Sequence, residues 1–295
     1  MKARLAAFAA AVLLAGCSAT PRAALAPAAP RQYLGVSSPD GMAGVTAFAK
    51  ETGSRPSLVS YYTGWYAKFD QMQTSAISAY GALPLVFLDS GTVPLSLVAA
   101  GPDTWLTGYA KAVAAWGKPV AFSFDSEFNG PWWPWSFNHG SPAVFTAAWR
   151  RVVTIFRQAG AENVTWVWTV AASSPVTTAL GPWWPGASYV NWVGVNAYYT
   201  EPYSVFSTVF GPTLQQVGKV TGDPVLITET GASPAAGRPR AITDLFRGIE
   251  ADRSILGSIW FDYDKPSAHG PDHDWQIDND PAALAAFRKA AEEYR

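Results

Sequence analysis

Eight short β-like runs alternate with helical runs along most of this sequence, and the alternation constrains the fold more than any other feature. The strand candidates cover residues 33–38, 57–62, 83–89, 119–125, 164–169, 190–198, 224–229 and 257–263. Helical candidates lie near residues 41–52, 70–80, 104–116, 141–159, 205–221 and 238–253, with a last one near 281–294. Strands that alternate with helices in this way are typical of an α/β protein with a parallel sheet.

The number of strands favours a barrel over an open sheet. Eight strands between residues 33 and 295 match the size and rhythm of a single (β/α)₈ TIM barrel. A doubly wound open sheet is the alternative, but it usually has fewer strands and often a glycine-rich phosphate turn after the first. The segment GVSSPDG, residues 35–41, lacks that pattern. Because no change of composition divides the region, we predict one domain over residues 33–295.

The amino-terminal sequence predicts an export signal. Lys2 and Arg4 precede an apolar run that stops at Cys17, the only cysteine in the chain. The ending Leu-Ala-Gly-Cys resembles a bacterial lipobox, in which the cysteine is acylated; an ordinary secretory signal with an incidental cysteine is the alternative. We therefore expect a lipoprotein signal peptide over 1–17 and an Ala/Pro tether over 18–32. The protein would be exported and anchored to the membrane of the cell envelope by a lipid on Cys17.

Composition excludes some partners and raises the question of sugars. Only 15% of the residues are charged and the formal net charge is −1, so nothing predicts binding to nucleic acid. The chain has 14 Trp, 12 Tyr and 15 Phe, and several of these lie in Gly/Pro-rich loops. Core packing is the default explanation for large aromatic residues. Their flat apolar faces also suit sugar rings, so a polysaccharide or oligosaccharide partner is a hypothesis. We expect a monomer.

In a barrel of this kind the active site lies at the carboxyl ends of the strands. Alternation predicts three inward-facing sets there: Ser123, Asp125 and Glu127; Gly194, Asn196 and Tyr198; and Ser258, Trp260 and Asp262. Glu229 ends the seventh strand candidate. A lone glutamate at a strand end is usually solvated or ion-paired. Two glutamates at one mouth instead allow glycoside hydrolysis, with retention or inversion according to the separation of their carboxyl groups.

Several segments resemble glycoside hydrolase family 26 in order and spacing. They are SEFNGPWWPWS (126–136), AWRRVVTIFRQAGAENVTWVWT (148–169), WWPGASYVNWVGVNAYY (183–199), PVLITETGAS (224–233) and DWQIDNDPAALAAFRKAA (274–291). The resemblance covers most of residues 33–295. It implies a retaining (β/α)₈ enzyme that is expected to cleave a polymeric β-glycan internally. A β-1,4-mannan is the first choice, and mixed-linkage β-glucan and xylan are the alternatives.

The resemblance also implies roles for single residues. Glu127 matches the acid/base and Glu229 the nucleophile. Trp132 matches an aromatic of the cleavage subsites, Tyr198 a tyrosine that hydrogen-bonds the nucleophile, and Trp260 a platform beneath the sugar that is cleaved. Further candidates for sugar contact, each with packing as the alternative, are Asn129, Trp133, Trp184, Trp65, Trp275, Asp125 and Ser126.

Two departures from the family pattern keep other hypotheses open. Ser126 stands where the family usually has His, and Ser123 where many members have Arg. A non-catalytic glycan-binding lipoprotein on the same barrel is therefore the main alternative, and a solute-capturing lipoprotein is a weaker one. The segment HGPDHDWQID (269–278) mixes His and Asp, but its spacing matches no strong metal site. No metal and no cofactor are expected.

Overall fold

The structure is a computed structural model that describes residues 33–102, 104–172, 178–264 and 273–294. Residues 31–295 form one compact unit. The predicted signal peptide, the tether and Cys17 lie outside the described residues. Within the described part of the chain, no helix is both long enough and apolar enough to cross a membrane.

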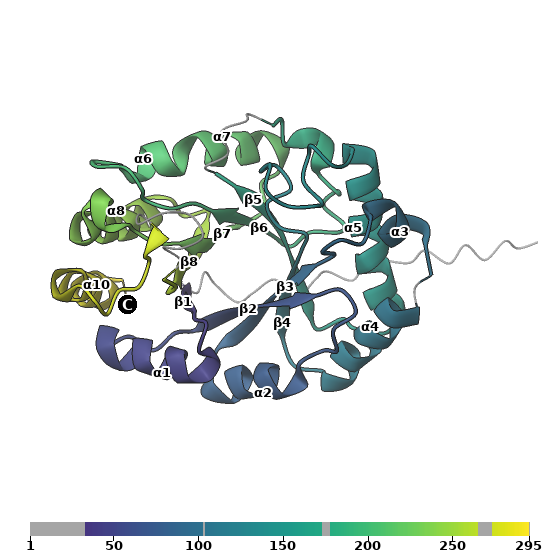
Figure 1. The fold of residues 1–295 in the computed structure, drawn as a ribbon, viewed down its shortest axis with the longest axis horizontal. Coiled ribbons are helices and arrows are strands. Elements are labelled where there is room, and N and C mark those ends of the chain that lie inside the picture. The colour runs from purple at the N-terminus through teal and green to yellow at the C-terminus, as the bar shows by residue number, and fades with distance from the viewer. Residues whose placement is uncertain (1–32, 103, 173–177, 265–272, 295) are drawn as a thin grey trace, which may run out of the picture. The chain divides into compact units, whose positions relative to one another are not determined.

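The described residues confirm the predicted barrel. Eight parallel strands pair in sequence order, and the last pairs with the first to close the barrel (Figure 1). The strands are β1 (Tyr33–Ser37), β2 (Leu58–Gly64), β3 (Leu83–Asp89), β4 (Val120–Phe124), β5 (Val164–Ala171), β6 (Trp192–Asn196), β7 (Val225–Thr230) and β8 (Ile255–Phe261).

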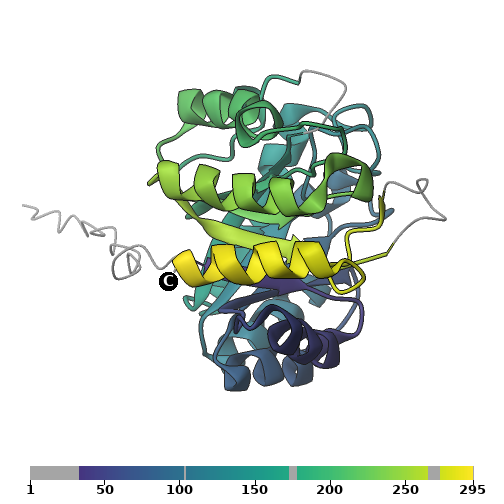
Figure 2. The same ribbon diagram turned by 90° about the vertical axis from the view of Figure 1, so that its left-hand side faces the viewer.

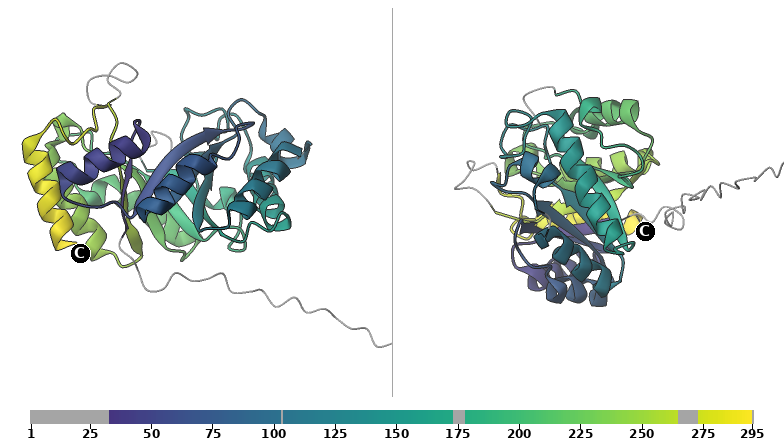
Figure 3. Two further views of the ribbon diagram at one scale, coloured as in Figure 1. Left: turned by 90° about the horizontal axis from the view of Figure 1, so that it is seen from below. Right: turned by 90° about the vertical axis from the view of Figure 1, so that its right-hand side faces the viewer.

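Helices surround the barrel, as Figure 1 shows. They are α1 (Gly41–Thr52), α2 (Gln71–Tyr80), α3 (Leu95–Ala100), α4 (Thr104–Trp116), α5 (Pro142–Gln158), α6 (Phe206–Val209), α7 (Gly211–Val220), α8 (Arg238–Ala251) and α10 (Pro281–Glu293). Two short 3₁₀ turns, η1 (Gly181–Trp183) and η2 (Pro234–Ala236), lie in the loops after β5 and β7. Helices α8 and α10 lie side by side (Figure 2), and α10 also lies next to α1 from the start of the domain (Figure 3).

Helices α5 and α10 begin at side-chain caps. The Ser141 side chain accepts a hydrogen bond from the Val144 backbone N–H at the start of α5. The Asp280 carboxylate accepts two, from the Ala282 and Ala283 N–H groups, at the start of α10. Each cap satisfies N–H groups that have no partner within the helix, which fixes where the helix begins.

Buried apolar residues form two separate clusters, as the pattern of a barrel requires. The inner cluster draws its buried members from strands alone: Leu58, Leu85, Phe87, Ala121, Val167, Trp192, Leu226, Leu256 and Ile259. These residues fill the barrel. The outer cluster combines strand residues such as Phe122 and Phe124 with the buried faces of the helices. Phe122 packs against Phe156 and Phe124 against Trp149, both of α5, so these two strand residues face the helices.

Two irregularities break the alternation in β7 and β8. Between β6 and β7 the register passes from the Val195–Ile227 pair to the Asn196–Glu229 pair and leaves out Thr228. In β8, Leu256 and Ile259 both belong to the inner cluster although they are three residues apart. Gly257, with φ of 139°, lies between them. A bulge of this kind changes the face to which the following side chains point.

Glycine is required at position 194 because the barrel interior is narrow there. A Cβ atom on Gly194 would lie 2.3 Å from Thr169 Oγ1 and 2.8 Å from Thr228 Oγ1. Both hydroxyls form hydrogen bonds. Thr169 Oγ1 shares a hydrogen bond with Ser123 Oγ (2.7 Å), and Thr228 Oγ1 donates to Asn196 Oδ1 (2.6 Å). A side chain at position 194 would therefore disturb the polar layer beneath the mouth.

We expect Gly194→Ala to destabilise the domain by about 1–3 kcal/mol, the usual effect of overpacking. Gly218→Ala in α7 is the matched control, because nothing lies within 4 Å of a Cβ there. It should stabilise the domain by up to about 1 kcal/mol through helix propensity. Denaturant unfolding of both variants measures the difference. Equal stabilities would contradict the assignment of Gly194 to a filled layer.

Candidate active site

The chain has an unusual backbone conformation where it leaves the sheet after β4. Asp125 and Glu127 have positive φ angles of 42° and 58°, a region that residues other than glycine seldom occupy. The Glu127 N–H donates to the Thr169 carbonyl of β5 (3.0 Å), and the Glu127 carbonyl accepts from the Gly130 N–H (2.9 Å). These bonds hold the strained turn in place. Strain of this kind is concentrated at functional sites.

The side chain of Glu127 lies among three N–H donors. The indole Nε1 atoms of Trp132 and Trp133 donate to Oε2 at 2.8 and 3.0 Å, and Asn196 Nδ2 donates to Oε1 at 3.1 Å. Trp132 and Trp133 are 43% and 40% exposed, so ring surface is still open to a ligand. The carboxyl group is thus fixed in orientation at the edge of two accessible aromatic rings.

The side chain of Glu229 lies between two tyrosine hydroxyls. Tyr62 Oη of β2 donates to Oε1 (2.7 Å), and Tyr198 Oη, just after β6, donates to Oε2 (2.6 Å). Burial raises the pKa of Tyr198 well above its usual range, and the charges of Glu229, Tyr62 and Glu127 raise it further. Tyr198 therefore stays protonated and can donate to Glu229. The hydrogen bond expected of Tyr198 is present.

The two glutamates face one mouth. Asn196 donates to Glu127 and accepts from Thr228, which directly precedes Glu229. The charges of both glutamates act on Tyr198. The bulge at Thr228 explains how Glu229 reaches the mouth: with Leu226 inside the barrel, strict alternation would turn Thr228 inward and Glu229 outward. The irregular register brings both residues to the polar layer.

Three polar candidates from the sequence are buried beside the mouth. Asp125 is fully buried, and its Oδ1 accepts from the Ser90 N–H at 2.7 Å. Asn129 is 5% exposed, and its amide bonds both the N–H and the carbonyl of Ala171. Ser126 is 7% exposed, and its carbonyl accepts from Trp135 Nε1. The side chains of Asp125 and Asn129 hold the loop after β4 to its neighbours, and their contact with sugar stays a prediction.

The predicted inward-facing position of Trp260 is wrong. Trp260 is 2% exposed and packs against Phe287 of α10, with ring centroids 5.8 Å apart, in the outer cluster. The bulge at Gly257 is the physical reason, because it shifts the alternation on which the inward assignment of Trp260 rested. The aromatic ring next to the mouth is Trp275, whose centroid lies 4.5 Å from that of Tyr198. Trp275 is itself 3% exposed, so it supports Tyr198 more than it offers a free surface.

Two further tryptophans pack on the outside of the barrel. Trp65 lies against Trp105 of α4 at 4.6 Å and against Phe124 at 6.0 Å between ring centroids. Trp184 meets Trp168 edge-on at 5.1 Å. Phe124 and Trp168 both belong to the outer cluster. Packing therefore accounts for Trp65 and Trp184, and of the tryptophan candidates Trp132 and Trp133 have the open faces.

Sequence reasoning missed three members of the site. Tyr62 was not considered, although it alternates with Leu58 and Ser60 and so faces the mouth. Asn196 was placed on the inward face but given no role. Asp89 ends β3 after Leu85 and Phe87 of the inner cluster and was overlooked. The two-residue alternation of each strand was the signal that could have found all three.

No metal site is present among the described residues: no group of three or more potential ligands is close enough together. His273 packs against Trp275, with ring centroids 5.5 Å apart. His269, the other histidine of the segment considered for metal binding, lies outside the described residues.

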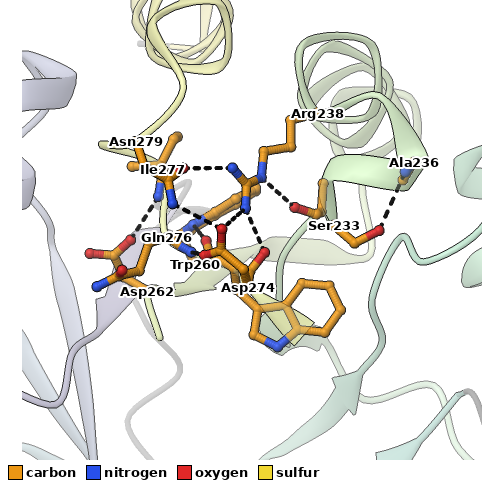
Figure 4. A network of polar contacts seen from close by, with 11 residues as sticks. Ser233, Ala236, Arg238, Trp260, Asp262, Asp274, Gln276, Ile277 and Asn279 are labelled. Carbon is orange, nitrogen blue, oxygen red and sulfur yellow. Dashed lines mark hydrogen bonds and ion pairs between the residues drawn. The ribbon is translucent and has the colours of Figure 1, made fainter. Parts of the chain in front are cut away.

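An arginine beneath the mouth holds the segment that carries Trp275 (Figure 4). Arg238 is 4% exposed. Its guanidinium donates to the Ala232 carbonyl (2.9 Å), to Asn279 Oδ1 (2.6 Å) and to the Asp274 carbonyl (2.6 Å), and it pairs with Asp274 Oδ2 (2.8 Å). Trp260 Nε1 adds a bond to the Trp275 carbonyl (2.9 Å). These contacts tie the loop after β7 to the segment after β8.

Comparison with known proteins identifies the family. The model of glycosyl hydrolase family 26 matches residues 106–265, more than half of the chain. The chain belongs to glycosyl hydrolase family 26. The matched stretch contains both glutamates and the aromatic loop after β4.

The proteins similar to this chain are named for different activities. Endoglucanase H of Acetivibrio thermocellus is 26% identical over 83% of this chain and 28% of its own length. The β-1,3-xylanase TXYA of a Vibrio species is 27% identical over 57% of this chain and 39% of its own length. The chain thus spans well under half of either protein. A β-mannanase structure from Bacteroides ovatus has the same fold, with a TM-score of 0.66, 16% identity and 90% coverage of both chains.

We expect Arg238→Met to destabilise the domain by about 3 kcal/mol, because it leaves Asp274 and several carbonyls without their partner. It should also loosen Trp275 and, through Tyr198, the environment of Glu229. Arg240→Met is the matched control. Arg240 is exposed, and within the described part of the chain it donates to the Ser204 and Ala236 carbonyls, so its loss should change stability by less than about 0.5 kcal/mol. Thermal unfolding of the two variants tests the assignment, which equal losses would contradict.

Proposed function

We propose that the protein is a retaining β-glycoside hydrolase, with Glu229 as nucleophile and Glu127 as acid/base. The observation that carries the proposal is the pair of glutamates at one mouth, each held by its own set of donors. Membership of family 26 supports the reaction class. The donor sets support the division of roles, because two hydroxyls on Glu229 orient a charged attacking group and the open aromatic edge leaves Glu127 accessible to a leaving oxygen.

The reaction would proceed in two balanced steps. In the first, a Glu229 oxygen bonds to the anomeric carbon while the glycosidic C–O bond breaks. Glu127 gives its proton to the departing oxygen. In the second step, Glu127 takes a proton from water, and the water oxygen bonds to the anomeric carbon as the bond to Glu229 breaks. The second step restores the proton of Glu127 and the carboxylate of Glu229.

The substrate we propose is a polymeric β-glycan cleaved internally. Trp132 and Trp133 offer partly exposed indole faces beside Glu127, and such faces suit the apolar C–H surface of sugar rings. β-1,4-Mannan is the first candidate because the structural neighbour from Bacteroides ovatus is a β-mannanase. Mixed-linkage β-glucan and xylan are the next candidates, in line with the names of the endoglucanase and the β-1,3-xylanase.

Glu229→Ala should lower kcat/KM on the cleaved glycan by at least about 10⁴-fold, because a covalent step loses its nucleophile. Glu201→Ala, a change at an exposed glutamate, should leave kcat/KM unchanged. Assays on mannan, glucan and xylan would measure the loss, and proton NMR of the first product would give the anomeric configuration. Activity retained by Glu229→Ala would refute the assignment, and an inverted first product would refute retention. Binding of a glycan without cleavage by the wild type would favour the non-catalytic alternative.

We further propose that Cys17 carries a lipid that anchors the exported protein to the cell envelope. The support is the charged start, the short apolar run and the single cysteine at its end. In cells of a lipoprotein-processing bacterium, Cys17→Ser should move the protein from the membrane fraction to the soluble fraction and abolish labelling by a radioactive fatty acid. An unlabelled wild-type protein would indicate an ordinary signal peptide instead.

A further inference from the structure

The turn after β2 presents an exposed tyrosine on a strained backbone. Tyr66 has a φ angle of 69°, in the left-handed region that residues other than glycine seldom occupy. The Asp89 carbonyl accepts from the Trp65 N–H (2.8 Å), and the Gly64 carbonyl accepts from the Ala67 N–H (3.1 Å). These bonds enforce the turn from within. Strain of this kind persists only where surrounding contacts hold it, and it is concentrated at functional sites.

Helix α4 holds the same turn from outside the barrel. Trp105 Nε1 donates to the Ala67 carbonyl at 2.9 Å. The Trp105 ring meets the Tyr66 ring edge-on, with centroids 5.8 Å apart and planes at 70°. Tyr66 is nevertheless 68% exposed. The tyrosine ring is therefore supported at one side and open to solvent over most of its surface, so burial does not explain why the chain keeps it in a strained position.

A cavity of about 260 Å³ lies beside the exposed ring and has room for a sugar ring. Its lining is mostly apolar and includes Trp65, Tyr66, Leu97, Thr104, Trp105 and Arg151. Arg151 is the one charged residue among the described residues of the lining, and its guanidinium donates to the Val98 and Gly101 carbonyls (3.2 and 2.6 Å). Apolar walls with a few polar groups are typical of ligand sites. The cavity suits an uncharged ring with hydroxyl groups better than an anion.

The exposed tyrosine lies at the same end of the barrel as the two glutamates. Tyr62, four residues before Tyr66, donates to Glu229 and is 40% exposed. Four residues span at most about 14 Å, so the Cα atoms of the two tyrosines lie within that distance of each other. A glycan that reaches Glu229 can therefore reach the turn after β2 within the length of a few sugar rings.

We propose that Tyr66 and the cavity beside it form a distal subsite, which binds a sugar ring of the β-glycan several rings away from the bond that is cleaved. The subsite rests on the proposed function in so far as its ligand is the glycan that the enzyme cleaves. The apolar face of the sugar stacks on the exposed tyrosine ring. The Thr104 hydroxyl in the cavity wall offers a hydrogen-bond partner to the hydroxyl groups of the sugar. Long chains gain this contact, and short ones do not reach it.

Tyr66→Gly tests the subsite, because it removes the ring and relieves the backbone strain together. The melting temperature should not fall, since glycine adopts a positive φ at little cost. In the inactive Glu229→Ala background, the affinity for the polymer that the protein binds should fall about three- to tenfold, the usual worth of one aromatic stacking contact. Isothermal titration calorimetry with soluble β-1,4-mannan, mixed-linkage β-glucan and xylan measures the affinity, and differential scanning calorimetry the melting temperature.

Two matched variants in the same background serve as controls. Tyr66→Phe keeps the ring and should keep the affinity within about twofold. Met72→Ala removes an apolar side chain of α2 that is 83% exposed and lies outside the lining of the cavity, so it should leave the affinity unchanged. An affinity that survives Tyr66→Gly, or that falls equally in Met72→Ala, would overturn the subsite.

The length of the substrate separates the subsite from the catalytic pair. In the active enzyme, Tyr66→Gly should raise KM on the polymer about three- to tenfold at unchanged kcat, because a distal contact is the same in the ground state and the transition state. On short oligosaccharides of the same glycan, KM should match that of the wild type. An unchanged KM on the polymer would overturn the subsite and leave the proposed function intact. Glycan binding that depends on Tyr66 in a wild type that cleaves no glycan would support the subsite and refute only the proposed function.

Discussion

Closure of eight parallel strands into a barrel is the constraint on which the rest of the structure depends. Parallel strands end at the same rim, so closure collects the last side chains of β2, β3, β4, β6 and β7 within one mouth. Below them the inner apolar cluster fills the barrel. In the polar layer beneath the mouth, Asn196, Thr228 and Glu127 form one chain of hydrogen bonds across the barrel, which offsets part of the cost of burying polar groups.

The sequence was sufficient for the architecture, because the alternation of strands and helices is a local pattern. It was also sufficient to place Glu127 and Glu229 at the carboxyl ends of their strands. It failed at Trp260 because nothing in the sequence showed that Gly257 would adopt a φ of 139° and shift the strand by one residue. The irregular register of β7 worked in the opposite direction, since it brought Glu229 inward where strict alternation would not. Bulges depend on pairing between strands, and a single strand pattern cannot reveal them.

Exposure was the second quantity that the sequence could not supply. Trp65 and Trp133 both follow a strand and precede Gly/Pro-rich or polar loops, yet one packs outside the barrel and the other lies open beside Glu127. The two serines at the departures from the family pattern are likewise explained only by contacts. Ser123 bonds Thr169 inside the barrel, and the Ser126 carbonyl holds Trp135. The polar contacts to Glu127 come from Trp132, Trp133 and Asn196.

The environments of the two glutamates differ in a way that bears on their roles. Glu229 accepts from the hydroxyls of Tyr62 and Tyr198, and burial keeps Tyr198 protonated. Glu127 accepts at both oxygens from N–H groups, those of Trp132 and Trp133 at Oε2 and that of Asn196 at Oε1. Hydrogen bonds to a carboxylate favour its charged form, so the number of donors does not separate the two glutamates. Glu127 instead adjoins Asp89 and Asp125, whose buried carboxyl groups add negative charge or hold protons according to pH. A retaining glycosidase needs one carboxyl group that stays charged and another that exchanges a proton. In this barrel the difference arises from which neighbours each strand end receives: tyrosines from β2 and β6 at Glu229, and aspartates from β3 and β4 at Glu127.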